Sequence, residues 1–208
     1  MMEQRTPEWF AMRCGKVTAS RVSDIVAKTK SGYSASRANY MAELLCERLT
    51  GTVGESYKNA AMEWGIATEP RAIAAYEAMA GVLVEQIGFI PHSTITMSGA
   101  SPDGLVGADG LVEIKCPNTA THVETLLGGS IPSKYINQMQ WQMACSGRQW
   151  CDFVSFDPRM PVHMQIFIQR LPRNDDQIKV LEEEVIKFLA ELDEQQTKLT
   201  QLYGEDDE

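Results

Sequence analysis

The sequence predicts an α/β fold in which helices flank a central mixed β-sheet. Three observations support this class. Apolar residues recur at helical spacing through the first 80 residues, short apolar runs separated by Gly, Pro or Ser follow from residue 82, and one long apolar stripe at helical spacing begins at residue 175. A chain of 208 residues is long enough for one compact core and short for two. We therefore expect a single domain over residues 1–200.

The N-terminal region, residues 1–80, is predicted to be helical. Thr18 and Ser20 are typical capping residues and favour a helix that runs to about residue 28. Ser34 and Ser36 favour the start of a second helix, which the glycine at position 51 ends. We expect a third helix over residues 59–80 and polar loops over residues 28–33 and 51–57.

Strand-like runs and helices alternate in residues 82–170, and a C-terminal helix and an acidic tail follow. In chain order, we expect strands over 82–90, 94–97, 103–106 and 111–115, helices over 118–127 and 133–145, strands over 150–156 and 163–169, a helix over 175–200 and a tail over 201–208. Short strands joined by tight turns are expected to pair in an antiparallel manner.

The net charge of −9 is distributed unevenly along the chain. Residues 181–208 carry ten acidic residues against two lysines, whereas residues 1–60 carry nine basic residues against six acidic ones. The basic N-terminal region is therefore available for an anionic ligand, and the low isoelectric point does not exclude nucleic acid. We expect DNA to meet the N-terminal and sheet side of the molecule, with the acidic C-terminal helix facing away.

Neither a membrane span nor a cysteine-held metal is expected. The sequence contains no apolar run of the length that crosses a bilayer and no apolar leader behind its first charges, so we expect a cytoplasmic protein. The five cysteines are scattered and form no CxxC pair, which is typical of reduced, packed thiols. We therefore expect no disulfide framework, no zinc site and no iron–sulfur cluster.

The segment from Ser101 to Pro117 is the most informative part of the chain. Asp109-Gly110 between two apolar runs predicts a hairpin that pairs 103–106 with 111–115. Because side chains alternate along a strand, Glu113 and Lys115 share one face with Leu111, and Val112 and Ile114 occupy the other. The hairpin brings Asp103 close to Glu113, although a single bulge would change the register.

Two converging carboxylates without a neighbouring His or Cys suit a hard divalent ion such as Mg²⁺, with Mn²⁺ as a substitute. Such a site supports phosphodiester hydrolysis, in which the metal polarises the phosphate and helps to ionise a water. Lys115 would orient or deprotonate that water and offset the developing negative charge.

Pro102-Asp103, nine intervening residues and Glu113-Ile114-Lys115 resemble the PD-(D/E)xK nuclease signature. The surroundings resemble the phage lambda exonuclease and YqaJ-like viral recombinase family along nearly the whole chain: Trp9, residues 13–20, Trp64-Gly65, Glu69, residues 101–104, residues 113–117, Gly128-Gly129, Tyr135, residues 138–140 and residues 157–160. The resemblance implies a restriction-endonuclease-like core in one nuclease domain. It also implies a Mg²⁺-dependent alkaline exonuclease that digests the 5′-ended strand of linear duplex DNA to mononucleotides, works as a ring-shaped homotrimer and leaves a 3′ single strand for a single-strand annealing protein.

The resemblance assigns roles to individual residues. Asp103 and Glu113 match the metal-binding acids, with the Ile114 carbonyl as a third ligand, and Lys115 matches the catalytic lysine. Glu69 and Gln138 match further active-site residues; the alternatives are an acid favoured in the first turn of a helix and a solvated mid-helix glutamine.

Four residues match a pocket for the 5′-terminal phosphate: Arg13, Ser20, Lys30 and Ser101. A guanidinium suits a terminal phosphate because it offers two parallel donors, and a lysine at position 30, where the family can have an arginine, loses that fork. Ser20 can also act as a helix cap. Met62 matches the apolar wedge that splits the terminal base pair, and its alternative is a core position.

Three other functions share parts of this pattern. A restriction- or repair-type endonuclease has the same metal chemistry, but the phosphate-pocket residues speak against it. A RecB-like nuclease would often hold an iron–sulfur cluster, and the cysteines here do not cluster. A non-catalytic DNA-end-binding protein would not need Asp103, Glu113 and Lys115 together.

Overall fold

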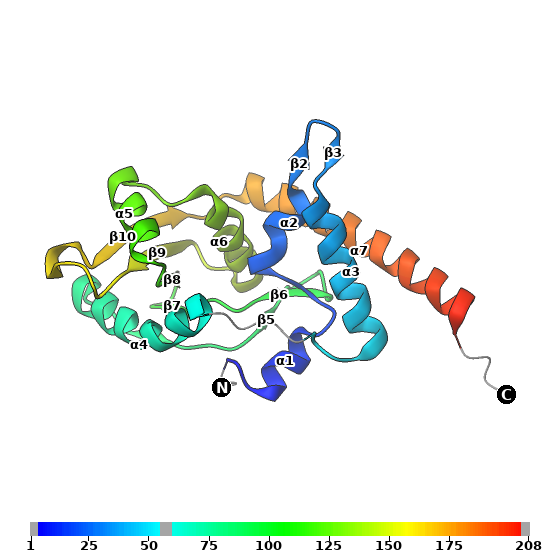
Figure 1. Cartoon of the computed structure of the whole chain (residues 1–208), viewed down its shortest axis with the longest axis horizontal. Coiled ribbons are helices and arrows are strands. Elements are labelled where there is room, and N and C mark those ends of the chain that lie inside the picture. The colour runs from blue at the N-terminus through cyan, green and yellow to red at the C-terminus, as the bar shows by residue number, and fades with distance from the viewer. Residues whose placement is uncertain (1–3, 55–59, 205–208) are drawn as a thin grey trace.

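The computed structural model describes residues 4–54 and 60–204. A five-stranded mixed sheet lies at its centre, in the order β10-β9-β8-β7-β4 (Figure 1). The strands β8 and β9 are parallel, and the other neighbours are antiparallel. This arrangement confirms the mixed sheet. Its strands are β4 (Val84–Glu85), β7 (Gly104–Val106), β8 (Gly110–Lys115), β9 (Trp150–Phe156) and β10 (Ile166–Pro172).

The β7–β8 hairpin fixes the register that the sequence left open. Gly104 lies opposite Val112 and Val106 opposite Gly110, and the same register continued by one residue sets Asp103 beside Glu113. The loop has three residues, and Gly110 belongs to the strand. A Cβ at Gly110 would lie 2.1 Å from the ring of Trp150, which explains why the strand has no side chain there.

Two helices cover the two faces of this sheet. The helix α4 (Ala60–Ala80) packs on the face of Val112 and Ile114, and α6 (Ser133–Ser146) packs on the face of Leu111. Since Glu113 and Lys115 alternate with Val112 and Ile114, they point to the α6 side, as predicted. The helix α5 (Thr119–Gly128), capped by Asn118, follows β8 and packs on β9.

A second, smaller sheet joins the N-terminal region to the core. Its strands are β1 (Val17–Thr18), β6 (Ser98–Ala100) and β5 (Ile90–Pro91), with β1 and β6 parallel. The helix α1 (Pro7–Arg13) precedes β1. A 3₁₀ turn η1 (Ala19–Arg21), α2 (Val22–Val26), the hairpin β2–β3 (Lys28–Thr29 and Gly32–Tyr33) and α3 (Ala35–Thr50) follow it. Their apolar residues form one core cluster with α6 and α7.

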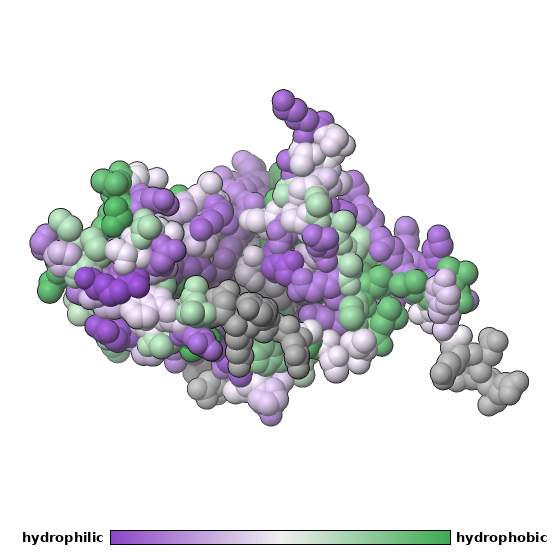
Figure 2. All heavy atoms as spheres, in the orientation of Figure 1, coloured by the Kyte–Doolittle hydropathy of each residue, from purple (hydrophilic) through white to green (hydrophobic). Residues whose placement is uncertain are grey.

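The C-terminal helix α7 (Asp175–Tyr203) is the longest element and packs on α2, α3 and α6. Its acidic residues form ion pairs with the N-terminal region, Arg37–Glu191 at 2.6 Å among them. Figure 1 shows its C-terminal half extending away from the central sheet. Figure 2 shows hydrophilic residues at the tip of the β2–β3 hairpin and a mixture of hydrophilic and hydrophobic residues towards the end of α7. In the described part of the chain, no helix has the length and apolarity to cross a membrane.

Several predicted boundaries are wrong. The helix expected after Thr18 and Ser20 is a 3₁₀ turn followed by a five-residue α2, and neither side chain caps it. Residues 28–33 form a small hairpin instead of a loop, and 94–97 form a turn that precedes β6. The strand expected over 82–90 is divided into β4 and the start of β5 at Ile90, and that over 163–169 begins after the 3₁₀ turn η2 (Val162–Met164). The expected helix start at 59, part of the 51–57 loop and the end of the acidic tail lie outside the described residues.

Candidate active site

Glu113 is the centre of the predicted site. It lies on β8 with 1 % of its surface exposed. Its Oε1 accepts hydrogen bonds from Gln138 Nε2 at 2.6 Å and from the Lys115 ammonium, and its Oε2 accepts one from Gln142 Nε2 at 2.5 Å. Buried carboxylates are costly unless they are paired and hydrogen-bonded, and both oxygens meet that condition here.

Asp103 stands beside Glu113 at the start of β7. Its Oδ2 accepts a hydrogen bond of 2.6 Å from the backbone nitrogen of Ile114, which holds the side chain against β8. Burial and the neighbouring Glu113 carboxylate raise the pKa of Asp103 well above its usual range, and Lys115 opposes them. The two carboxylates are therefore close enough to repel each other, as two ligands of one cation would.

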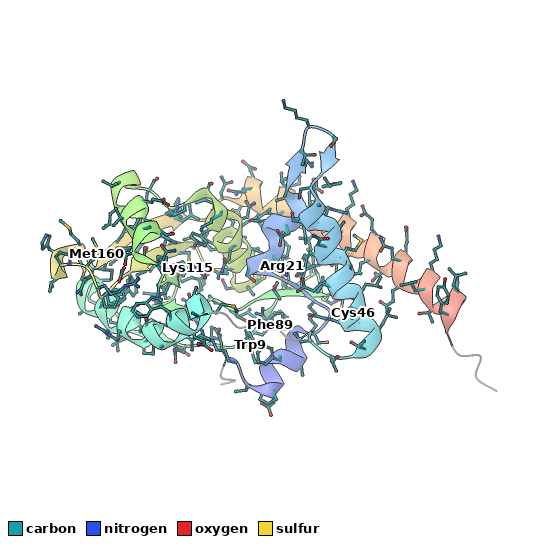
Figure 3. All side chains as sticks on the ribbon, in the orientation of Figure 1. Trp9, Arg21, Cys46, Phe89, Lys115 and Met160 are labelled. Carbon is teal, nitrogen blue, oxygen red and sulfur yellow. The ribbon has the colours of Figure 1, made fainter. Side chains whose placement is uncertain are left out.

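Lys115 is the last residue of β8, and Figure 3 labels its position. Its ammonium pairs with Glu113 and lies 5.1 Å from the ring centre of Tyr135. Burial lowers the pKa of Lys115, but the Glu113 and Asp103 charges and the Glu113 hydrogen bond outweigh burial and raise the pKa above its usual value. In this structure Lys115 is therefore a charged donor.

Glu69 reaches the same region from α4, which contacts β8. It forms an ion pair of 2.6 Å with Arg5, and its charge contributes to the raised pKa of Asp103. Sequence reasoning did not find Arg5. The structure thus brings Glu69 close to the two acids, as the resemblance implies.

Arg13 and Ser101, two of the four predicted phosphate-pocket residues, are in direct contact. Arg13 donates to Ser101 Oγ at 3.2 Å, and Trp9 Nε1 donates to the same oxygen at 3.0 Å. The Arg13 guanidinium also stacks on the Trp9 ring at 4.0 Å, and burial lowers its pKa. Since Ser101 precedes Asp103 by two residues, this cluster adjoins the acids.

Ser20 leaves the small sheet at the same end as Ser101. The parallel β1–β6 pair aligns Thr18 with Gly99, and each serine follows two residues later. Ser20 is exposed, with its Oγ 3.5 Å from Thr18 Oγ1, and it does not cap a helix.

The structure does not bring Lys30 or Met62 into this cluster. Lys30 is exposed at the turn of the β2–β3 hairpin, which projects from the body beside α2 (Figure 1). Met62 lies in the first turn of α4 with 45 % of its surface exposed, so it is not a core position. Its role as a wedge stays a prediction.

Gln142 was not predicted as a site residue. The signal for it is its spacing of four residues from Gln138, which places both on one face of α6. Its amide is fully buried, whereas an ordinary mid-helix glutamine is solvated.

The donor set fits a hard divalent cation. Asp103 and Glu113 offer carboxylate oxygens, and the Ile114 carbonyl is the third predicted oxygen. A carboxylate has about four acceptor sites, and the three donors on Glu113 leave one open. Among the residues that the structure describes, there is no group of three or more His, Cys, Asp and Glu that could hold a metal.

Comparison with known proteins gives a family and a fold. Residues 8–149 match the YqaJ-like viral recombinase domain. The alkaline exonuclease LHK-Exo from Laribacter hongkongensis is 55 % identical, with a TM-score of 0.88 over 94 % of this chain and 97 % of that one. Its complex with dAMP gives a TM-score of 0.89 at the same identity and the same coverage of both chains.

A more distant structure shows the same fold. The phage-related exonuclease from Haemophilus somnus 129PT is 16 % identical, with a TM-score of 0.71 over 88 % of this chain and 96 % of that one. No curated protein matched the sequence. The chain belongs to the YqaJ-like viral recombinase domain family and is a nuclease with a PD-(D/E)xK core.

Proposed function

We propose that this chain is a Mg²⁺-dependent exonuclease that digests the 5′-ended strand of linear duplex DNA to mononucleotides and leaves a 3′ overhang. The 55 % identity to LHK-Exo, an alkaline exonuclease, supports DNA exonuclease activity. The dAMP complex of that protein supports a site that accommodates a nucleoside 5′-monophosphate.

One observation carries the proposal. Three charged groups converge at one end of the β7–β8 hairpin, namely the carboxylates of Asp103 and Glu113 and the ammonium of Lys115. Ser101 lies two residues before Asp103 and contacts Arg13, so the guanidinium lies near these groups. A hydrolytic centre with a cationic anchor beside it suits a substrate whose terminal phosphate is held while the next phosphodiester is cut.

Asp103, Glu113 and the Ile114 carbonyl would hold the metal. When bound, the Mg²⁺ supplies Lewis-acid polarisation of the phosphate and a more acidic water. Mn²⁺ would substitute, because it prefers the same oxygen ligands.

Lys115 would act on the attacking water. Its ammonium pairs with Glu113, so it lies beside the proposed cation. From there it would orient or deprotonate the water and offset the negative charge that develops on the phosphate, while Gln138 holds Glu113.

In this proposal, the Arg13–Ser101 pair determines the 5′-to-3′ direction of digestion. The stacked Trp9 ring limits the motion of the guanidinium, and Arg13 keeps further donors for a 5′-terminal phosphate. In this proposal, Ser20 and Lys30 add contacts to the DNA end and Met62 separates the terminal base pair. An endonuclease cuts inside a strand and would not need a site that holds a terminal phosphate.

The remaining features rest on the family resemblance. We propose that the enzyme works as a homotrimeric ring around DNA, passes its 3′ strand to a single-strand annealing protein and acts in the cytoplasm of a bacterial host. In this arrangement α7 faces away from the DNA, and truncation after Gln196 leaves DNA binding unchanged. A sharp loss of DNA binding on truncation would contradict that placement.

The test compares three substrates in Mg²⁺: linear duplex with 5′-phosphate ends, the same duplex with 5′-hydroxyl ends, and closed circular DNA. We expect mononucleotide release from the phosphorylated duplex, slower release from the hydroxyl-ended duplex, and an intact circle. Cutting of the circle would indicate an endonuclease. Absence of hydrolysis in the wild type and in Asp103→Ala alike would indicate an end-binding protein.

A further inference from the structure

A second glutamine of α6 holds the catalytic acid. Gln142 lies one helical turn after Gln138 and has no exposed surface. Gln138 donates to Oε1 of Glu113 at 2.6 Å, and Gln142 donates to Oε2 at 2.5 Å. One helix face therefore holds both oxygens of the same carboxylate.

The Gln142 amide has suitable partners at both ends. An ionised carboxylate only accepts hydrogen bonds, so the amino group of Gln142 faces Glu113. The Gln142 Oε1 lies 3.9 Å from the Cys151 thiol on β9, which also has the Asp152 carbonyl within 4.0 Å. Burial raises the pKa of Cys151 well above its usual value, so the thiol is a donor at this end.

The hydrogen bonds of Glu113 leave its open acceptor site on one particular oxygen. Among the described residues, Oε1 accepts from Gln138 and Lys115, whereas Oε2 accepts from Gln142 alone. Each carboxylate oxygen has about two acceptor sites, so the open one belongs to Oε2. Gln142 determines the direction of that site because it occupies the other lone pair of the same atom.

We propose that Gln142 is a positioning residue that holds Glu113 Oε2 in the orientation in which it binds the divalent cation, an inference that rests on the proposed function. Gln138 and Lys115 fix the other oxygen, so the three donors together present one oxygen to the cation. Partners of this kind typically contribute 10- to 100-fold to metal affinity.

The same helix offers a matched control. Gln140 is 1 % exposed, donates to the Pro172 carbonyl at 2.9 Å and accepts from the Asn174 nitrogen at 3.0 Å. Gln140→Met and Gln142→Met each remove one buried amide from α6 and keep a side chain of similar length. Only Gln142→Met removes a contact to Glu113.

The experiment measures Mn²⁺ binding without DNA, by electron paramagnetic resonance, and the melting temperature without metal. Both variants are expected to melt below the wild type, since each leaves buried polar partners unsatisfied. Gln142→Met is expected to weaken Mn²⁺ binding at least about tenfold. Gln140→Met is expected to bind Mn²⁺ within about twofold of the wild type, because Gln140 contacts Pro172 and Asn174 and its loss leaves the hydrogen bonds of Glu113 in place.

Equal Mn²⁺ affinity in Gln142→Met and the wild type, or an equal loss in both variants, would overturn the inference. If Gln142→Met does not fold, Gln142→Asn gives the same test, since its shortened amide cannot reach Glu113 and the same loss is expected. Digestion of linear DNA by the wild type is scored separately. A wild type that binds Mn²⁺ but leaves DNA intact would refute the proposed function, and the affinities would still decide the role of Gln142. A wild type that binds no Mn²⁺ would overturn the inference together with the proposed metal site.

Discussion

Replacing Asp103 with Asn should abolish hydrolysis and stabilise the metal-free protein. The substitution keeps an oxygen that can accept from the Ile114 nitrogen, but it removes one of two adjacent carboxylates. Burial and Glu113 raise the pKa of Asp103 in the folded state above its unfolded value of about 3.9. Below about pH 3.9, Asp103 is protonated in both the folded and the unfolded protein, and the folded state is at its most stable. As the pH rises from there to the pKa of Asp103 in the folded state, the free energy of unfolding falls. The loss is up to about 1.4 kcal/mol per pH unit in that window.

The assay is thermal unfolding of both proteins in EDTA at pH 5, 6, 7 and 8. For a domain of this size, about 1.4 kcal/mol corresponds to roughly 3–6 °C in melting temperature. The melting temperature of Asp103→Asn should therefore rise, relative to that of the wild type, by up to that amount per pH unit. The gain stops when the pH passes the pKa of Asp103 in the folded wild type. Added Mg²⁺ should raise the melting temperature of the wild type alone. Parallel pH curves, or a variant that is less stable at pH 8, would refute the electrostatic reasoning.

In the same samples, Mg²⁺-dependent hydrolysis of linear duplex DNA should fall at least about a thousandfold in Asp103→Asn, since a lost metal ligand costs several kcal/mol of transition-state stabilisation. A variant that is both more stable and active would contradict the assignment of Asp103 as a ligand. Metal removal by EDTA should abolish hydrolysis by the wild type to the same extent.

Three further predictions concern the phosphate anchor and the core. Arg13→Met should reduce the preference for 5′-phosphate over 5′-hydroxyl ends about 10- to 100-fold, because a charge-assisted hydrogen bond contributes roughly 1.5–3 kcal/mol. Arg173→Met is the control. An unchanged preference in Arg13→Met would contradict its role as the phosphate anchor. Burial raises the pKa of Asp157, but hydrogen bonds from Arg159 and Thr119 outweigh it and lower the pKa to about 2. The contribution of Asp157 to stability is therefore present above about pH 4 and lost as the pH falls through about 2. In urea unfolding, Asp157→Asn should lower the free energy of unfolding by up to about 2 kcal/mol at pH 7 and leave it unchanged below about pH 2. Gly110→Ala should destabilise the protein by roughly 1–3 kcal/mol in urea unfolding, because the added Cβ meets the Trp150 ring, on which Arg170 stacks at 3.4 Å; unchanged stability would show that the ring moves.

The β7–β8 hairpin shows what the sequence could predict. Alternation along 111–115 placed Glu113 and Lys115 on one face, and the structure confirms it, because a period of two leaves each residue only one face. The turn predicted only that Asp103 lies near Glu113, and the exact register came from the structure. The loop has three residues, one fewer than the expected strands 103–106 and 111–115 leave between them, because Gly110 already pairs with Val106 in the ladder.

Other parts of the fold depend on contacts that no local pattern carries. The strands β1 and β6 have two and three residues, too few to show alternation, and they pair across some 80 residues of chain. Ser20 therefore could not be placed opposite Ser101 from sequence. The helix expected after Thr18 is divided into the 3₁₀ turn η1 and the short α2, which no local pattern indicates.

Gln142 was missed for a related reason. Glutamine in the middle of a helix is usually solvated, and only the packing of α6 on β8 and β9 buries this one against Glu113. The spacing of four residues from Gln138 indicated that both glutamines share one face of α6, but it did not indicate that Gln142 is buried. Conversely, the hairpin that carries Lys30 could be read only as a polar loop, because Lys28–Thr29 and Gly32–Tyr33 are both exposed or half-buried and lack an apolar pattern.

The central claim is that the site at Asp103, Glu113 and Lys115 removes nucleotides from the 5′ end of one strand. The most direct measurement follows two linear duplexes in Mg²⁺, one labelled at the 5′ phosphate and one at the 3′ end of the same strand. We expect the 5′ label to appear at once as a mononucleotide while the 3′ label stays in a shortening strand, and Asp103→Asn to release neither. Early release of the 3′ label, labelled internal fragments, or equal release by Asp103→Asn would contradict the account.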